Sequence, residues 1–107
     1  MDKMIKTIWI ESEDKGPIIE GQENTDDNSD VIVTFSDDTK YIATFLTYDN
    51  VKTLTEKNKR TGELLSGKYF WASDMILVDR IDRDTIENVV DDLIKEKYFA
   101  QLFKFVE

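Results

Sequence analysis

The alternation of apolar and polar residues predicts strands in the first half of the chain. Residues 4–11 are rich in Ile, Thr and Trp, which suit a half-buried pleated surface, so we expect a first strand there. Two alternating runs, 31–35 and 40–48, flank a turn at 36–39 that holds two aspartates. Short polar side chains close such turns locally, so these runs predict a β-hairpin. A further strand is expected within 69–81, centred on its Ile-Leu-Val run.

Two later segments place apolar residues at helical spacing. Residues 49–61 begin with Asp49 as an N-cap and end in basic residues followed by glycine, which predicts a short helix. A longer amphipathic stripe is formed by Ile86, Val89, Val90, Leu93 and Ile94. Asp82 or Asp84 is the expected cap of this second helix. The aromatic tail 98–107 either extends that helix or adds a turn.

The predicted elements follow the order β, long loop, β, β, α, β, α, with the loop covering 12–29. Strands and helices mix without regular βαβ alternation, which favours an α+β fold. We expect an antiparallel sheet of about four strands with two helices packed on one face. A chain of 107 residues supports one hydrophobic core, so residues 1–107 are expected to form a single domain.

The residue types present limit the chemistry of the protein. Histidine and cysteine are both absent from the sequence. The commonest general base, the commonest metal ligand and the softest nucleophile are therefore missing, so we expect no enzyme and no cofactor. No apolar run approaches the roughly 18 residues that cross a bilayer, and the N-terminus lacks the apolar stretch of a signal peptide. We expect a cytoplasmic protein without membrane contact.

One acidic motif resembles a calcium-binding loop in its opening residues. Asp26, Asn28 and Asp30 have the spacing of the first three ligands. The sixth position, where the sharp turn requires glycine, is Val31, and the twelfth is Asp37 in place of glutamate. We interpret the motif as a chance match and expect no metal site.

The charge of the chain is strongly negative and unevenly distributed. The formal net charge is -9, and residues 11–38 hold ten acidic side chains against Lys15 alone. A surplus of this size repels phosphate backbones, so nucleic acid is not an expected partner. An acidic surface from one segment can steer a cationic protein toward the molecule. The alternative is that the charge serves only solubility.

The stretch GKYFWASDM, residues 67–75, places three aromatic residues in a row. In extended backbone Tyr69 and Trp71 point to one side and Phe70 to the other. Two interpretations stay open: Phe70 lies in the core while its neighbours cover the sheet edge, or Tyr69 and Trp71 are exposed as anchors for a partner. In the tail, Phe99, Phe103 and Phe105 are expected to dock on the sheet. Phe105 is out of phase with its neighbours, and if exposed it would indicate a patch for self-association or for a partner.

Residues 31–98, which contain GKYFWASDMILVD between a short helix and an amphipathic helix, carry a resemblance to a known class. They resemble small acidic bacterial immunity proteins of contact-dependent or polymorphic toxin systems. The resemblance implies that the protein binds and neutralises a cognate toxin domain. It assigns no individual residues.

The charge pattern supports the same hypothesis, because an inhibitor of a basic nuclease needs carboxylates for the toxin's cleft and no catalytic groups. The residues that we expect to contact such a toxin are Asp26, Asp27, Asp30, Asp37, Asp38, Tyr69 and Trp71. Two alternatives remain: a nucleic-acid mimic that inhibits DNA-binding proteins, or a small structural or regulatory interaction domain. The oligomeric state stays open, with a monomer as the simplest case.

Overall fold

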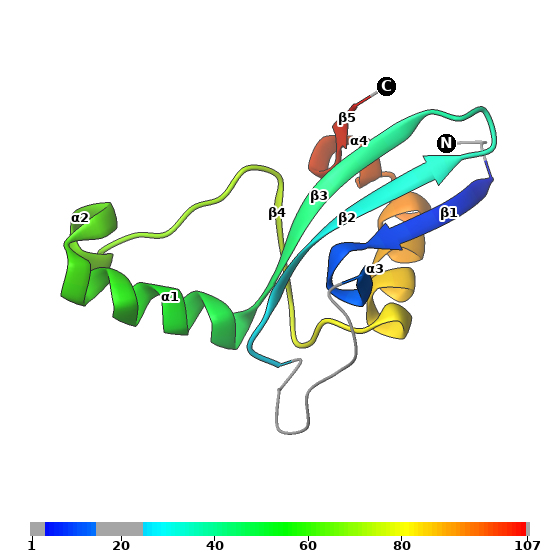
Figure 1. Ribbon diagram of the computed structural model, residues 1–107. Helices are drawn as coiled ribbons and strands as arrows, with labels where there is room; N and C mark the ends of the chain where they lie inside the picture. Colours follow the sequence, from blue (N-terminus) through cyan, green and yellow to red (C-terminus); the bar gives the residue numbers. More distant parts are fainter. Residues whose placement is uncertain (1–3, 15–24, 107) are drawn as a thin grey trace.

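The computed structural model describes residues 4–14 and 25–106, and Figure 1 shows the arrangement of its elements. The strands are β1 (Ile5–Ile10), β2 (Asn28–Phe35), β3 (Lys40–Thr47), β4 (Met75–Val78) and β5 (Lys104–Phe105). The α-helices are α1 (Tyr48–Thr61), α2 (Glu63–Gly67), α3 (Arg83–Lys95) and α4 (Phe99–Leu102), and a short 3-10 helix, η1, spans Glu11–Asp14.

The described strands form one sheet in the order β1-β2-β3-β4, with β5 paired to β3 beyond the end of β4. The β1-β2 and β2-β3 pairs are antiparallel, which confirms the predicted hairpin. β4 runs parallel to β3, with Thr44 opposite Met75, and β5 runs antiparallel to β3. The α+β class is therefore confirmed, with one parallel pair inside a mainly antiparallel sheet.

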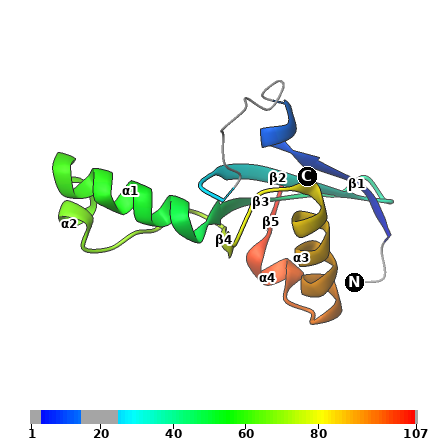
Figure 2. The same cartoon turned by 90° about the horizontal axis from the view of Figure 1, so that it is seen from below.

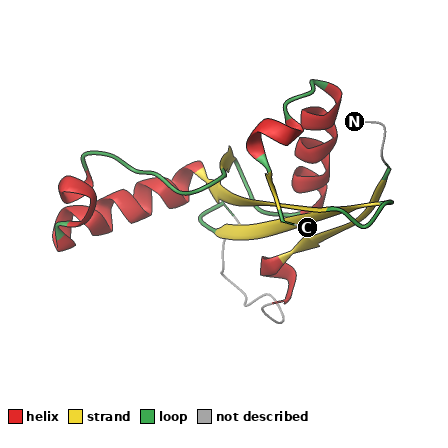
Figure 3. Cartoon of the chain, turned by 90° about the horizontal axis from the view of Figure 1, so that it is seen from above, coloured by secondary structure: helices red, strands yellow, loops and turns green. Residues whose placement is uncertain are grey.

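The alternation in β2 produces the two faces of the sheet. Every second residue of this strand is buried, and the buried apolar ones are Val31, Val33 and Phe35. Helices α3 and α4 cover this face, while η1 lies on the other side of the sheet (Figures 2 and 3). The core therefore lies between the sheet and these two helices. Apolar side chains that recur every second residue in the strands and every 3.6 residues in the helices face this layer.

The predicted amphipathic helix is confirmed as α3. Asp82 is its cap, because its carboxylate accepts a hydrogen bond from the Thr85 backbone N–H at 2.8 Å. Ile86 and Val90 of the apolar stripe are fully buried. The tail does not extend α3 as one helix: the chain turns at Lys97, whose φ is 64°, and then forms α4 and β5.

Two of the three tail phenylalanines complete the core as expected, whereas Phe105 does not dock there. Phe99 and Phe103 are buried and stacked, with ring centroids 4.3 Å apart. Phe99 also makes edge contacts with Phe35 at 5.4 Å and with Tyr41 at 5.3 Å. Phe105 is 56% exposed and keeps one edge contact with Tyr41.

Residues 48–74, which we call the arm, leave the sheet at the end of β3 and return to it at the start of β4. The arm contains α1, α2 and the segment 68–74, and it projects away from the rest of the molecule, which we call the body (Figure 1). The Cα radius of gyration is 15.0 Å, whereas a compact chain of this length has about 13 Å. The projection of the arm accounts for this elongation.

The local chemistry of the arm sets where its helices begin and turn. Thr47, and not the predicted Asp49, caps α1, because its hydroxyl accepts a hydrogen bond from the Asn50 N–H at 3.0 Å. α1 ends at Gly62, which adopts the left-handed conformation with φ 85°. The next residues form a left-handed turn, Leu64–Ser66, that ends at Gly67.

Three details differ from the expected architecture. The two helices that cover the sheet are α3 and α4, whereas α1 packs chiefly against α2. The strand expected within 69–81 is confined to Met75–Val78. The aromatic triplet therefore belongs to the arm and not to the sheet, and Phe70 is only partly buried and lies outside the core.

Candidate functional site

The five aspartates expected to contact a partner occupy two separate places. Asp26, Asp27 and Asp30 lie at the start of β2, beside the root of the arm, whereas Asp37 and Asp38 lie in the turn after it. β2 has eight residues, so the two groups are separated by about 25 Å. The sheet does not bring them together into one acidic patch.

The aspartates at the root hold the arm to the body. Asp26 accepts hydrogen bonds from the Asn50 side chain at 3.0 Å and from the Thr53 hydroxyl at 2.7 Å. These bonds from α1 lower the pKa of Asp26, although the carboxylate stays exposed. Asp27 contributes its backbone, since its carbonyl accepts from the Thr47 N–H at 3.0 Å.

Asp30 belongs to the same end of the sheet through a second set of contacts. Its carboxylate accepts a hydrogen bond from the Thr44 hydroxyl at 2.9 Å. The Thr44 N–H donates in turn to the carbonyl of Asp74, the last residue of the arm, at 3.0 Å. Asp30 is thus two hydrogen bonds away from the returning end of the arm.

The aspartates of the turn are engaged locally. Asp37 accepts hydrogen bonds from the backbone N–H and the hydroxyl of Thr39, at 3.1 and 2.6 Å. Asp38 has a φ of 67° and pairs with Lys6 of β1 at 2.8 Å. The hydrogen bond from Lys6 to Asp38 raises the pKa of Lys6. Both groups are exposed, so this ion pair contributes little to stability.

The arm exposes the two aromatic residues expected to anchor a partner. Trp71 is 61% exposed and Tyr69 is 49% exposed, while Phe70 and Ala72 between and after them are partly buried. This alternation agrees with the interpretation in which Tyr69 and Trp71 face solvent. Their side chains are therefore available at the surface of the arm.

Two further exposed apolar residues of the arm were not expected. Tyr48 is 59% exposed at the root, and Leu65 is 69% exposed in the left-handed turn at the tip. We call Tyr48, Leu65, Tyr69 and Trp71 the arm apolar set. The two glycines that bracket Glu-Leu-Leu-Ser indicate a special turn, but no periodic pattern in the sequence shows that Leu65 points outward.

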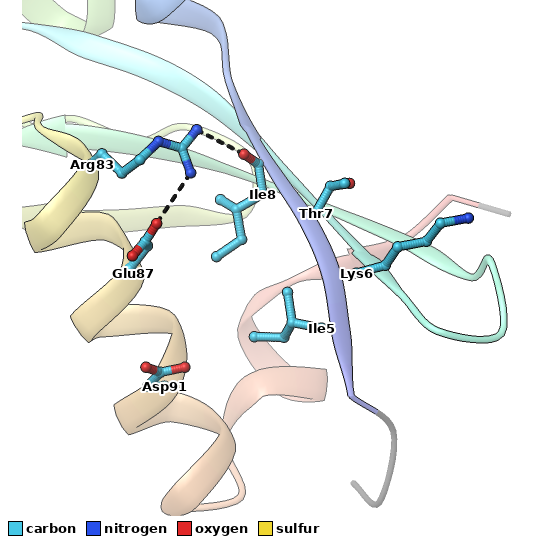
Figure 4. A pocket seen from close by; sticks show the side chains of 7 residues that line it. All are labelled: Ile5, Lys6, Thr7, Ile8, Arg83, Glu87 and Asp91. Atoms are coloured by element: carbon cyan, nitrogen blue, oxygen red, sulfur yellow. Dashed lines mark hydrogen bonds and ion pairs between the residues drawn. The ribbon is translucent and has the colours of Figure 1, made fainter.

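A groove runs between β1 and α3, on the far side of the body from the arm. Figure 4 shows Ile5 and Ile8 of β1 facing the helix, with Glu87 and Asp91 on the helix side. Arg83 closes one end, because its guanidinium donates to the carbonyl of Ile8 at 2.9 Å and to Glu87 at 3.2 Å. The charged groups at this end of the groove are thus engaged in holding the edge strand to α3.

Part of the acidic segment is neutralised inside the molecule. Glu13 of η1 accepts two hydrogen bonds from Arg83, at 2.6 and 3.0 Å. The bonded guanidinium lowers the pKa of Glu13. Asp14 accepts a hydrogen bond from the indole N–H of Trp9. These carboxylates of η1 therefore contribute to the fold as well as to the surface charge.

The described residues include no group of three or more acidic side chains placed to hold a metal ion. The calcium-like motif illustrates the reason, because Asp26 bonds to α1 whereas Asp30 bonds to Thr44 of the neighbouring strand. Within the same described ranges, the helices are all too short or too polar to cross a membrane.

No known family model matches the chain, and neither the curated proteins nor the solved structures compared with it show a significant similarity.

Proposed function

We propose that this protein is an immunity protein, which binds a cognate bacterial toxin domain through the arm and its acidic root. The single observation that carries this proposal is the arm apolar set, which presents four large side chains on a projection outside the core. Large aromatic side chains within a polar rim are the typical centre of protein interfaces. Such an inhibitor needs no catalytic group, which agrees with a sequence that lacks histidine and cysteine.

In this proposal the arm and its root act together as an occluding surface. Tyr69 and Trp71 insert into the toxin domain, and the carboxylates of Asp26, Asp27 and Asp30 face its lysine and arginine side chains. A basic nuclease cleft would meet the negative charge that nucleic acid otherwise supplies, so substrate entry would be blocked. The complex would form in the cytoplasm, where an immunity protein protects its own cell.

The acidic turn has a different place in this proposal. Asp37 and Asp38 lie at the opposite end of β2, so they contribute to long-range attraction and not to the contact itself. The nucleic-acid mimic is less well supported, because residues 31–36 between the two acidic groups carry no charge at all. A mimic would require carboxylates at phosphate-like intervals along one surface.

The experiment compares the two acidic groups with each other. The proposal predicts a toxin domain encoded beside this gene; that domain is purified as an inactive variant, and Kd is measured by calorimetry. We expect the triple variant D26N/D27N/D30N to weaken binding about tenfold, because neutralisation keeps the side-chain shape and removes the charge pairs. The matched control D37N/D38N should change Kd by less than about threefold.

The aromatic anchors are tested in the same assay. Trp71→Ala should weaken binding about thirtyfold or more, as expected for a buried aromatic anchor. Trp9→Phe, on the sheet of the body, is the control and should leave Kd unchanged. If Trp71→Ala and the root variant both bind as well as the wild type, the arm is not the contact surface and the proposal fails.

A further inference from the structure

The returning segment of the arm, residues 68–74, carries opposite charges at equal distances on either side of its centre. It reads Lys-Tyr-Phe-Trp-Ala-Ser-Asp, so Lys68 and Asp74 stand three residues before and three residues after Trp71. Lys68 lies at the tip of the arm and Asp74 at its root, next to β4. A copy of the segment running in the opposite direction would place each lysine beside an aspartate.

The middle of this segment has the character of an unpaired edge, whereas at its ends the Lys68 N–H donates to the Leu65 carbonyl and the Asp74 carbonyl accepts from the Thr44 N–H. Tyr69, Phe70 and Trp71 belong to no helix or strand. Among the described residues, the backbone hydrogen bonds of turns, loops and caps involve none of these three residues. Exposed backbone with unpaired N–H and C=O groups can pair with a second segment by adding a strand.

The side chains of the segment divide between two sides. Phe70 and Ala72 are partly buried, whereas Tyr69 and Trp71 are half exposed or more. Pairing through the backbone would leave the first two on the arm. The two aromatic rings would then lie against the rings of a second segment, where their apolar area becomes buried.

We propose that the free protein forms a two-fold symmetric dimer, in which segment 68–74 of one copy pairs antiparallel with the same segment of a second copy. The pairing is centred on Trp71, so that Lys68 faces Asp74 of the other copy and Tyr69 faces Ser73. A two-fold axis makes the contact self-complementary, so the ion pair between Lys68 and Asp74 forms twice. A parallel arrangement would place like charges together and is disfavoured.

Helix α1 carries the same polarity as the returning segment. Asp49, Thr53, Lys57 and Arg60 are spaced so that they share one face of the helix. The face is acidic at the root, where Asp26 also bonds to Thr53, and basic at the tip. An antiparallel arrangement of two arms therefore places the acidic root of each helix beside the basic tip of the other.

This dimer goes beyond the proposed function and does not require it, because it concerns the free protein. The two surfaces share Tyr69 and Trp71. If both proposals hold, a toxin partner displaces the second copy, and self-association weakens as partner is added.

The first test is sedimentation equilibrium of the full chain, from about 1 μM to 1 mM at low salt. We expect a monomer–dimer equilibrium whose Kd rises at least about tenfold in Trp71→Ala. Raising the salt concentration should also weaken the dimer several-fold. A protein that stays monomeric up to about 1 mM overturns the proposal.

Charge variants test the orientation of the pair. Lys68→Asp should weaken the dimer about tenfold, because two aspartates then face each other. Adding Asp74→Asn should recover part of this loss, and asparagine tolerates the positive φ of 51° at this position. The double variant D79R/R80D on the body is the control and should not change the dimer. A dimer that responds equally to all of these variants would disprove the arm contact.

Disulfide trapping tests the register directly, because the chain has no cysteine of its own. Tyr69→Cys and Ser73→Cys are prepared as two single variants. In the proposed register, residue 69 of one copy lies opposite residue 73 of the other, with their Cα atoms within about 6 Å. The two copies of residue 69 are about 13 Å apart, and so are the two copies of residue 73. Oxidation should link the mixed variants and neither variant alone. Linkage of Tyr69→Cys alone, at equal or higher yield, would overturn the antiparallel register.

Discussion

The body buries its largest aromatic rings in the core, whereas Tyr48, Tyr69 and Trp71 of the arm face solvent. Phe35, Phe45 and Phe99 of the body are each less than 2% exposed. Tyr48 and Trp71 of the arm are about 60% exposed. Because burial of apolar area is the main stabilising term in folding, the aromatic residues of the arm add little to the stability of the isolated chain. Their chemistry is suited to contacts with another molecule.

The two regions also differ in charge. The arm holds five basic and four acidic side chains, so it has a net charge of +1 within a chain of net charge -9. The surplus acid therefore belongs entirely to the body, and part of it is paired there, as Glu13 is with Arg83. The body is therefore acidic, whereas the arm carries charges of both signs.

The largest difference in the free energy of unfolding is expected between the loss of a core aromatic and the loss of an arm aromatic. Phe99→Ala removes a ring that contacts Phe35, Tyr41 and Phe103, so it should lower the free energy of unfolding by about 3–5 kcal/mol. Trp71→Ala should lower it by less than about 1 kcal/mol. Urea denaturation followed by circular dichroism, at a concentration where the chain is monomeric, measures both. Similar losses in the two variants would show that the arm is as well packed as the body.

A smaller effect is expected inside the arm itself. Gly67 has a φ of 78°, and a Cβ atom there would lie 2.7 Å from the Thr55 carbonyl oxygen. Gly67→Ala should therefore lower the local stability of the arm by about 2–3 kcal/mol, through crowding and the left-handed conformation. Gly62→Ala is the matched control, because Gly62 is also left-handed but open space surrounds its missing Cβ. It should cost about 1 kcal/mol.

The protein offers separate reporters for this measurement, because one of its two tryptophans lies in each region. In Trp9→Phe the remaining tryptophan fluorescence comes from the arm, and in Trp71→Phe the remaining tryptophan fluorescence comes from the body. Gly67→Ala should shift the arm signal to lower urea and leave the body signal nearly unchanged. Equal shifts of both signals would mean that the arm and the body unfold as one unit.

The smallest expected effect is the dependence of body stability on pH. The pKa of Glu13 is lowered from its ordinary value of 4.5 by the bond to Arg83, and that of Asp82 is lowered from 3.8 by the hydrogen bonds from Thr85. Unfolding therefore makes both groups bind protons more readily. Their stabilisation is fully present above the ordinary values and is lost as the pH falls through the lower folded values.

Urea denaturation between pH 6 and pH 3 measures this loss. Glu13→Gln should flatten the decline in stability at low pH, because the variant has no carboxylate to protonate. Glu63→Gln is the control, since Glu63 forms only a 3.8 Å ion pair with Lys57 on the arm. If the stability of Glu13→Gln falls at low pH as much as that of the wild type, the pair between Glu13 and Arg83 does not cause the pH dependence.

Much of the body could be predicted because its signals are local. The alternation around Val31 and Val33 sets one buried face of the hairpin, and the stripe through Ile86 and Val90 sets one buried face of α3. Phe99 was correctly expected to dock on the sheet. These patterns require no knowledge of distant contacts.

The arm could not be predicted in the same way, because its features depend on tertiary arrangement. Its first helix has Val51 and Leu54 on one side, which is also the pattern of a helix docked on a sheet. Nothing in that pattern shows that α1 packs chiefly against α2 instead. The parallel pairing of Thr44 with Met75 is likewise a long-range choice.

The candidate site was predicted in part, for the same physical reason. The exposure of Tyr69 and Trp71 was one of two interpretations that the sequence allowed. The closeness of the aspartates in sequence predicts one acidic surface, but a strand separates sequence neighbours by more than 3 Å per residue. Strand β2 therefore places Asp30 and Asp37 at opposite ends of the sheet.

The parallel pairing of β3 and β4 has a consequence for how such a protein can change. The chain leaves the sheet after Thr47 and re-enters it at Met75, and the ladder between the two strands fixes both junctions. Length and composition can therefore vary between these points while the register of the sheet is kept. A lineage under pressure to recognise new partners could diversify this insertion and inherit the rest of the scaffold unaltered.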